Sequence, residues 1–145
     1  QAALPGARGG ATVARMSAAY VDTSFLLAIV FGEPDASALR RRLLRFDHRL
    51  TGDLLRAEVL SAARREAVPF ETLQPALAAL SLVLPERTLE REMREALGHG
   101  YLRGADLWHV ACALFLAGDA RGELAFLSRD TAQRGIARRL GFPTP

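Results

Sequence analysis

The stretch that decides the fold is Ala18-Ala19-Tyr20-Val21-Asp22-Thr23-Ser24-Phe25-Leu26-Leu27-Ala28. Its first four residues form a short apolar run with aromatic and β-branched character, which is typical of a buried strand. A carboxylate and two hydroxyl residues follow, and apolar residues then recur at roughly helical spacing. The stretch predicts a strand that passes almost directly into a helix. Asp22 then lies at the carboxyl end of the strand, where open α/β sheets place their ligands.

Length and composition bound the class of protein. The chain has 145 residues, of which 50% are hydrophobic, and this length is typical of one domain with its own core. No apolar run approaches the roughly 20 residues that span a bilayer, so we expect no membrane segment. The single cysteine, Cys112, excludes an internal disulfide, and its apolar helical setting favours a packing role. These features predict a soluble, cytoplasmic protein.

The charge balance is compatible with a nucleic-acid partner. The formal net charge is +3, and all 19 basic residues are arginine. The planar guanidinium group suits phosphate recognition. The alternative is that GC-rich coding produces the arginine excess, because the chain also lacks lysine and asparagine. Charge by itself leaves both interpretations open.

Residues 1–17 differ from the rest of the chain. They show no periodicity, and their apolar stretch is too short for a secretory signal. We expect a disordered leader or a cloning remnant there, with Met16 as a candidate natural start. Residues 18–145 are expected to form the folded domain.

Predicted strands alternate with predicted helices along that domain. Strands are expected at 18–21, 49–51, 81–84 and 124–128, with an edge strand at 142–144 that Pro143 limits. Helices are expected at 24–31, 36–46, 54–67, 71–80, 86–97, 106–117 and 131–140. This alternation favours an α/β fold with a mainly parallel sheet of four to five strands, flanked by helices.

Glu58 is the most informative acidic residue. At helical spacing its neighbours include Leu54, Leu55 and Ala62, so its side chain projects from or beside the buried face. An ionised carboxylate in that position is costly unless it is hydrogen-bonded, paired or metal-bound. A pair with an arginine is the structural alternative to a metal site.

Asp22, Asp106 and Asp130 each lie where a helix is expected to begin, so each could simply cap that helix. Asp35 and Asp53 look similar and are interpreted as caps only. Context separates the first three. Asp22 and Asp130 follow the two most strand-like runs, and Asp106 opens the most apolar helix. Parallel strands bring such ends to one edge of a sheet.

Four carboxylates in one crevice would repel one another, and a divalent cation would relieve that repulsion. Oxygen ligands suit Mg²⁺, with Mn²⁺ as a substitute, and no His/Cys spacing favours zinc. His109 lies one helical turn after Asp106 and could line the same site, although a hydrogen-bonded histidine of the core is the simpler interpretation.

Four short sequence motifs follow one another along the chain in a recognisable order. They are Tyr20-Val21-Asp22-Thr23-Ser24, Ala57-Glu58-Val59, Ala105-Asp106-Leu107-Trp108-His109-Val110-Ala111 and Leu127-Ser128-Arg129-Asp130. Each is short, but their order and spacing together cover nearly everything from Ala18 to Phe142. In this combination the chain resembles the PIN-domain ribonucleases, and particularly the VapC toxins of bacterial toxin–antitoxin pairs.

The resemblance implies a three-layer α/β/α sandwich with Asp22, Glu58, Asp106 and Asp130 as its acidic site. It implies a Mg²⁺-dependent endoribonuclease, commonly a homodimer, that a cognate VapB-type antitoxin inhibits from a groove near the active site. Small hydroxyl residues usually stand beside the metal in this family, and Ser24 and Ser128 match them. Trp108 and Cys112 depart from the smaller or aliphatic residues common at their positions.

A mechanism follows as a hypothesis. Asp22 and Asp106 would hold one or two Mg²⁺ ions directly, and Glu58 and Asp130 directly or through water. Metal-activated water would then hydrolyse an RNA phosphodiester and leave 5′-phosphate and 3′-hydroxyl ends. Arg129 and the arginine-rich helix face with Arg40, Arg41 and Arg45 are candidates for positioning the phosphates, although each could be ordinary solvated surface.

Two other functions stay open at this point. A non-catalytic member of the same fold would use its acids only as caps or to receive a partner's arginines. A phosphatase of the haloacid-dehalogenase type would use Asp22 as nucleophile, but that chemistry normally needs an aspartate two residues later, where Ser24 stands. A P-loop enzyme is disfavoured, because the chain has no Gly-rich stretch ending in Lys-Ser or Lys-Thr.

Overall fold

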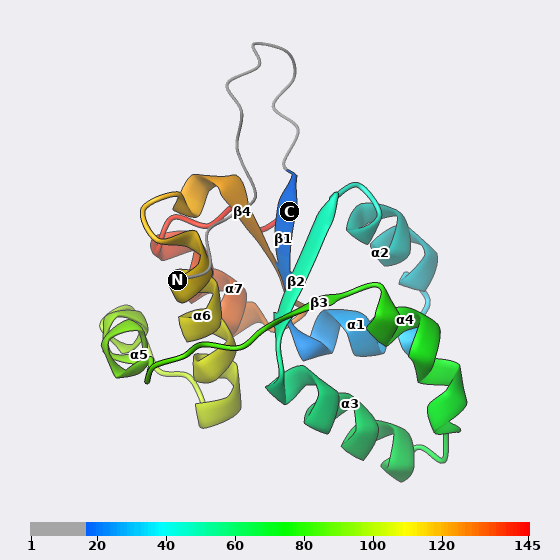
Figure 1. Cartoon of the computed structure of the whole chain (residues 1–145). Coiled ribbons are helices and arrows are strands. Elements are labelled where there is room, and N and C mark those ends of the chain that lie inside the picture. Colours follow the sequence, from blue (N-terminus) through cyan, green and yellow to red (C-terminus); the bar gives the residue numbers. More distant parts are fainter. Residues whose placement is uncertain (1–16) are drawn as a thin grey trace.

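Residues 17–145 are described by the computed structural model, and within them four parallel strands form one sheet (Figure 1). The strands are β1 (Ala18–Val21), β2 (His48–Gly52), β3 (Ser81–Val83) and β4 (Leu124–Leu127). Their order is β3-β2-β1-β4, so β1 lies between β2 and β4. The sheet confirms the predicted α/β fold. The predicted leader lies outside the described residues except for Ser17.

Helices cover both faces of this sheet, which makes the three-layer α/β/α sandwich (Figure 1). One face carries α1 (Thr23–Val30), α2 (Ala36–Leu43), α3 (Leu54–Arg65), the 3₁₀ turn Phe70–Leu73 and α4 (Gln74–Ala78). The other carries α5 (Glu90–Leu97), α6 (Gly104–Ala117) and α7 (Thr131–Arg139). A short 3₁₀ turn, Arg121–Glu123, leads into β4.

Strands β1 and β4 are apolar throughout because their side chains supply two cores. Ala18 and Tyr20 pack in the core under α5, α6 and α7, whereas Ala19 and Val21 pack in the core under α1 to α4. Successive strand residues point to opposite faces, so a strand covered on both sides needs apolar residues at every position. This burial on both faces explains why Ala18–Val21 is an unbroken apolar run.

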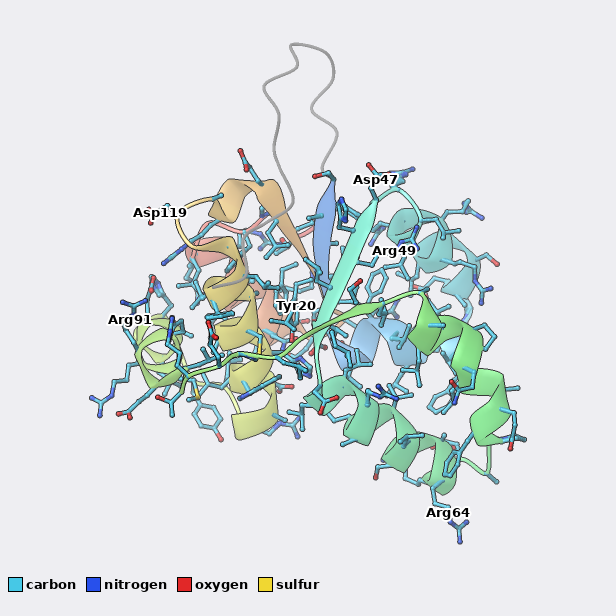
Figure 2. All side chains as sticks on the ribbon, viewed as in Figure 1. Tyr20, Asp47, Arg49, Arg64, Arg91 and Asp119 are labelled. Atoms are coloured by element: carbon cyan, nitrogen blue, oxygen red, sulfur yellow. The ribbon has the colours of Figure 1, made fainter. Side chains whose placement is uncertain are left out.

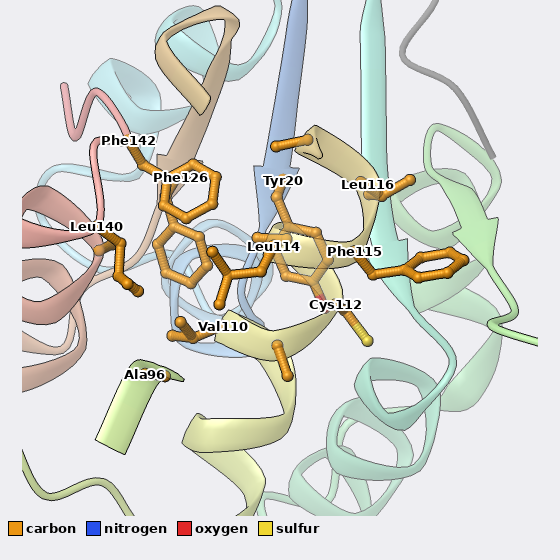
Figure 3. Close-up of a cluster of buried hydrophobic side chains, with 14 of the residues drawn as sticks. Tyr20, Ala96, Val110, Cys112, Leu114, Phe115, Leu116, Phe126, Leu140 and Phe142 are labelled. Atoms are coloured by element: carbon orange, nitrogen blue, oxygen red, sulfur yellow. The ribbon is translucent and has the colours of Figure 1, made fainter. Parts of the chain in front are cut away.

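Aromatic rings link strands β1 and β4 to Phe142. The rings of Tyr20 and Phe126 stack with centroids 5.6 Å apart, and Phe142 lies 6.2 Å from Phe126 (Figure 3). Figure 2 shows Tyr20 in the interior, whereas Arg64, Arg91 and Asp119 lie at the periphery.

Helix α6 is the central helix of its layer. Ten of its 14 residues are buried, which matches the prediction of a helix that is apolar nearly all round. Among residues 17–145, no helix is both long and apolar enough to cross a membrane.

Several predicted element boundaries are wrong. The helix expected at 71–80 is split into a 3₁₀ turn and α4, because Pro75 has no N–H to continue a single hydrogen-bond ladder. The helix expected at 86–97 begins only at Glu90. The edge strand expected at 142–144 does not form a ladder. Its contact with β4 is the hydrogen bond from Phe126 N–H to the Pro143 carbonyl, at 2.8 Å.

The carboxyl ends of β1 and β4 lie side by side. The two strands pair in parallel with Val21 opposite Leu127, and Asp22 N–H donates to the Leu127 carbonyl at 2.9 Å. The residues that follow these two strands therefore begin their helices, α1 and α7, at the same edge of the sheet. This arrangement confirms the parallel-strand geometry from which a shared site was predicted.

Candidate active site

An open cavity of about 540 Å³ lies at this edge of the sheet. Its walls come from the β1–α1 junction, α3, the start of α6 and the β4–α7 junction. The lining includes the four predicted acids, Asp22, Glu58, Asp106 and Asp130. Segments that are far apart in the sequence thus bring their carboxylates to one solvent-accessible cavity.

Asp22 is held at the base of the cavity by several donors. It caps α1, with its Oδ2 accepting from the Ser24 backbone N–H at 3.0 Å and the Ser24 hydroxyl at 2.6 Å. The Ser128 hydroxyl also lies 3.4 Å from Oδ2. The residue is only 3% exposed, so these contacts fix the direction of its carboxylate. Asp22 therefore acts as a cap and also lines the cavity, and the two roles do not exclude each other.

Gln133 connects Asp22 to two further walls. Its amide nitrogen donates to Asp22 Oδ1 and to the Asp106 backbone carbonyl, both at 3.1 Å. Its amide oxygen accepts from the Ser128 hydroxyl at 2.6 Å. The side chain is fully buried, on the first turns of α7. The neutral side chain of Gln133 thereby orients Asp22 without adding a charge to the cavity.

Asp130 and Asp106 enter the cavity from helix starts of different geometry. Asp130 caps α7, accepting from Gln133 N–H at 2.7 Å. Asp106 does not cap a helix, because α6 begins at Gly104 and places it in the first turn. Burial raises the pKa of Asp106, and the nearby charges of Asp22 and Asp130 raise it further. Arg103 opposes this shift from 3.5 Å.

Glu58 reaches the cavity from α3 and is hydrogen-bonded rather than paired with an arginine. Its Oε1 accepts from the Thr23 hydroxyl at 2.8 Å and lies 2.7 Å from His109 Nε2. Burial acts to raise the pKa of Glu58, but the hydrogen bonds from His109 and Thr23 outweigh it, so the pKa is lowered. His109 is fully buried, as the simpler interpretation of the sequence expected.

The PIN domain family model matches residues 19–139. The chain belongs to the PIN domain family. The matched range contains all four acids and all four strands except the first residue of β1. Comparison with curated proteins gives no match. PIN domains are generally nucleases, so the chain has a nuclease-type fold.

The donors of this PIN domain suit a hard divalent cation. Carboxylate and hydroxyl oxygens line the cavity, and the pKa of Asp106 is raised by burial and, after that, by the crowding of like charges that a cation would relieve. As they stand, no three His, Cys, Asp or Glu side chains of residues 17–145 converge closely enough to form a metal cluster. The carboxylate of Glu58 is bound to His109, and that of Asp130 to the start of α7.

The arginines that line the cavity of the PIN domain differ from those expected. Arg65 on α3 and Arg103 before α6 lie in its walls. Arg129 instead pairs with Asp35 and with Glu33, the latter at 3.3 Å. Helix α2, which carries Arg40, Arg41 and Arg45 on or just after it, packs on α1 and contributes nothing to the cavity lining.

Other predictions about polar residues can be compared directly with the contacts. Ser24 and Ser128 both bind Asp22, as expected for small hydroxyl residues beside the site. Asp35 and Asp53 occupy the N-cap positions of α2 and α3, as expected, but neither side chain makes a capping hydrogen bond. Thr23 and Gln133 were not predicted as site residues. Thr23 stood within the quoted motif, whereas nothing local distinguishes Gln133.

Proposed function

We propose that this PIN domain is a Mg²⁺-dependent endoribonuclease. The observation that carries the proposal is the placement of Asp22, Glu58, Asp106 and Asp130 around one open cavity at the carboxyl edge of the sheet. Asp22 is buried and the other three acids are partly buried, which is costly for ionised carboxylates unless they are hydrogen-bonded, paired or bind a ligand, and the family to which the chain belongs is generally nucleolytic. We propose RNA rather than DNA as the substrate because the motifs resemble those of VapC toxins.

The residues would divide the work as follows. Asp22 and Asp106 would hold Mg²⁺, or Mn²⁺ in its place, directly, and Glu58 and Asp130 would do so directly or through water. When bound, the cation would lower the pKa of a water molecule and offset charge on the scissile phosphate. Ser24, Ser128 and Gln133 keep Asp22 in place.

Arg65 and Arg103 would position the RNA backbone. They lie in opposite walls of the cavity, on α3 and before α6, and both side chains are largely exposed, at 72% and 78%. Their ion-pair partners, Glu66 and Asp106, lie at 3.4 Å and 3.5 Å, and such pairs of exposed arginines are weak, so phosphate oxygens could replace them. Contacts of this kind set the register of a nucleic acid without reading its sequence.

We further propose that the nuclease is the toxin of a VapBC-type pair and acts in the cytoplasm. Under this proposal a VapB-type antitoxin is its partner, and the active form is a homodimer. The support is the order and spacing of the four motifs together with the PIN family match. Coexpression with the gene encoded beside it would test the partnership, since only a cognate antitoxin should restore growth to cells that express the chain.

The decisive experiment compares Asp22→Asn with Asp53→Asn on a structured RNA, in Mg²⁺ and in EDTA. Both aspartates follow a strand and precede a helix, but Asp53 is exposed and outside the cavity lining. We expect Asp22→Asn to lose at least about a hundredfold in cleavage rate, as loss of a metal ligand would, and Asp53→Asn to cleave normally.

The product ends and metal binding separate the alternatives. Ends carrying 5′-phosphate and 3′-hydroxyl groups are expected, whereas a 2′,3′-cyclic phosphate would indicate a different nuclease chemistry. Undiminished cleavage by Asp22→Asn would exclude the metal mechanism. RNA binding that persists in EDTA, with no cleavage and no metal detected by calorimetry, would identify a non-catalytic PIN module.

A further inference from the structure

We infer that Tyr20 and His109 form a fixed hydrogen-bond chain that positions the carboxylate of Glu58 in the cavity. The chain runs from β2 through β1 and α6 to α3, so it ties together both layers of helices and the sheet between them. The geometric inference stands on the contacts alone. Its importance for cleavage rests on the proposed function.

The donors and acceptors fix the direction of this chain. Gly52 N–H donates to the Tyr20 hydroxyl oxygen at 3.0 Å, and that hydroxyl lies 2.7 Å from His109 Nδ1. On its other side, His109 Nε2 lies 2.7 Å from Glu58 Oε1. An ionised carboxylate only accepts hydrogen bonds, so Nε2 carries the hydrogen. In the tautomer that carries its hydrogen on Nε2, Nδ1 accepts the proton of the Tyr20 hydroxyl.

Glycine at position 52 is required for the first link. A Cβ at that position would lie 2.1 Å from Trp108 Cζ3 and 3.0 Å from the Tyr20 hydroxyl oxygen. Any larger residue would therefore displace either the indole ring or the phenol. The close approach of the β2 backbone lets its N–H reach Tyr20, and the Trp108 ring closes the remaining space.

The consequence for Glu58 is that its two oxygens have different roles. Both Thr23 and His109 bind Oε1, so among the described contacts Oε2 is the oxygen left for a ligand in the cavity. The side chain is 30% exposed, which is compatible with one fixed and one accessible oxygen. Partners of this type orient metal-binding carboxylates, and their loss typically weakens metal affinity by about tenfold or more. His109 and Tyr20 are thus positioning residues that act through Glu58.

Nitrogen-15 NMR of the metal-free, full-length protein tests the chain directly. We expect the hydrogen on Nε2 to be shared with Glu58 and Nδ1 to accept from the Tyr20 hydroxyl. A hydrogen on Nδ1 directed at the Tyr20 oxygen would overturn the assigned direction. In Tyr20→Phe, which removes only the hydroxyl, the Nδ1 resonance should shift. Tyr101→Phe is the matched control, because the other tyrosine of the chain is 79% exposed and should leave His109 unchanged.

Mn²⁺ calorimetry then connects the chain to function. Tyr20→Phe is expected to weaken Mn²⁺ binding about tenfold and to lower the cleavage rate, while Tyr101→Phe behaves like the wild type. His109→Gln, which keeps a donor amide, should retain more affinity than His109→Leu, with thermal unfolding checking that each variant is folded. Equal Mn²⁺ affinity of both Tyr→Phe variants would overturn the positioning role. If the wild type neither binds Mn²⁺ nor cleaves RNA, the proposed function fails instead. The NMR result would still show whether the hydrogen bonds from Tyr20 through His109 to Glu58 exist.

Discussion

The side chain of Gln133 joins three parts of the candidate site although it carries no charge. It donates to Asp22 and to the start of α6, and it accepts from Ser128. Because it is fully buried, none of these bonds can be replaced by water without rearrangement. Gln133 is therefore as important to the position of Asp22 as the serines beside it.

Replacing Gln133 with leucine should reduce both stability and cleavage. The change removes the amide donor to Asp22 Oδ1 and the amide oxygen that accepts from Ser128, both in a buried position, so we expect the free energy of unfolding to fall by about 1–3 kcal/mol. Cleavage should fall about tenfold, because Asp22 is no longer held. Urea unfolding and RNA cleavage measure the two effects. Gln74→Leu changes an exposed glutamine and should alter neither; equal behaviour of the two variants would contradict this role.

At the residue scale, the sequence identifies charges better than it identifies their supports. Asp22, Glu58, Asp106 and Asp130 could be chosen because carboxylates at strand ends or beside an apolar helix face need an explanation. The role of Gln133 depends on α7 approaching β1 across the chain, which no local pattern records. His109 could be placed on a buried face, but its contacts to Tyr20 and Glu58 are likewise non-local.

Helix α5 carries one buried carboxylate, that of Glu92. Glu92 accepts from Arg87 Nη2 at 2.6 Å and from Arg87 Nη1 at 3.0 Å, with its side chain only 6% exposed. The Arg87 guanidinium also lies over the Phe115 ring of α6, at 5.2 Å from its centroid. The hydrogen bonds from Arg87 lower the pKa of Glu92 from 4.5 to about 2.

This pair predicts a pH-dependent stability. Folding favours ionised Glu92, so its contribution is fully present above the unfolded-state pKa and is lost as the pH falls from about 4.5 to about 2. At neutral pH, Glu92→Gln should lower the free energy of unfolding by about 1–2 kcal/mol, and the difference should disappear toward pH 2. Urea unfolding at several pH values measures it.

Glu90→Gln is the control on the same helix. Glu90 pairs with Arg94, four residues later, at 2.9 Å, but both side chains are exposed. An exposed pair of this type contributes about 0.5 kcal/mol or less. A pH dependence as large for Glu90→Gln as for Glu92→Gln would contradict the role given to burial.

The end of α3 offers a matched pair of arginines. Arg65 lines the cavity, whereas its neighbour Arg64 points away from the molecule at the end of the helix (Figure 2). If Arg65 contacts phosphate, Arg65→Ala should weaken RNA binding and reduce the slope of log affinity against log salt by about 1. Arg64→Ala should leave the slope unchanged. Fluorescence titration over a range of salt concentrations measures both, and equal slopes for the two variants would remove Arg65 from the binding surface.

At the scale of elements, the sequence predicted which helices and strands exist better than it predicted the residues at which they begin and end. All four core strands were expected, because short apolar runs between turn residues identify them. Helix α5 starts later than predicted, at Glu90, and Arg87 lies before it, where its side chain pairs with Glu92. The arginine-rich surface of α2 was a plausible phosphate site by composition, but the packing of α2 on α1 directs it elsewhere.

The molecule as a whole brings like charges together at one edge of its sheet. Burial and the charges of Asp22 and Asp130 oppose ionisation of Asp106, so the metal-free fold carries an electrostatic cost there. Asp106→Asn should therefore raise the free energy of unfolding in EDTA by about 1 kcal/mol while abolishing cleavage. Thermal unfolding in EDTA and in Mg²⁺ measures this trade-off.

Magnesium should reverse the order of stability. At 100 times its Kd, a ligand of the folded state stabilises it by about 2.7 kcal/mol, so Mg²⁺ should stabilise the wild type and have little effect on Asp106→Asn. Asp119→Asn, which changes an exposed aspartate, should respond to Mg²⁺ as the wild type does. A wild type that Mg²⁺ fails to stabilise would contradict the metal assignment.

The fold class could be predicted from the alternation of strands and helices, and the order of the strands could not. That β1 lies between β2 and β4 follows from long-range pairing, for which the chain carries no local signal. The shared edge was nevertheless predictable in outline, since parallel strands must end on the same side. The three-layer arrangement was predicted only through the resemblance of the four motifs to a known family.

The position of Cys112 on α6 has a practical consequence. It is the chain's one cysteine, it is 0% exposed, and burial raises the pKa of its thiol to about 12. A thiol reagent in neutral solution therefore meets almost no thiolate until α6 separates from the sheet. The rate at which a reagent labels this single sulfur therefore measures how often the central helix α6 opens locally in the native protein.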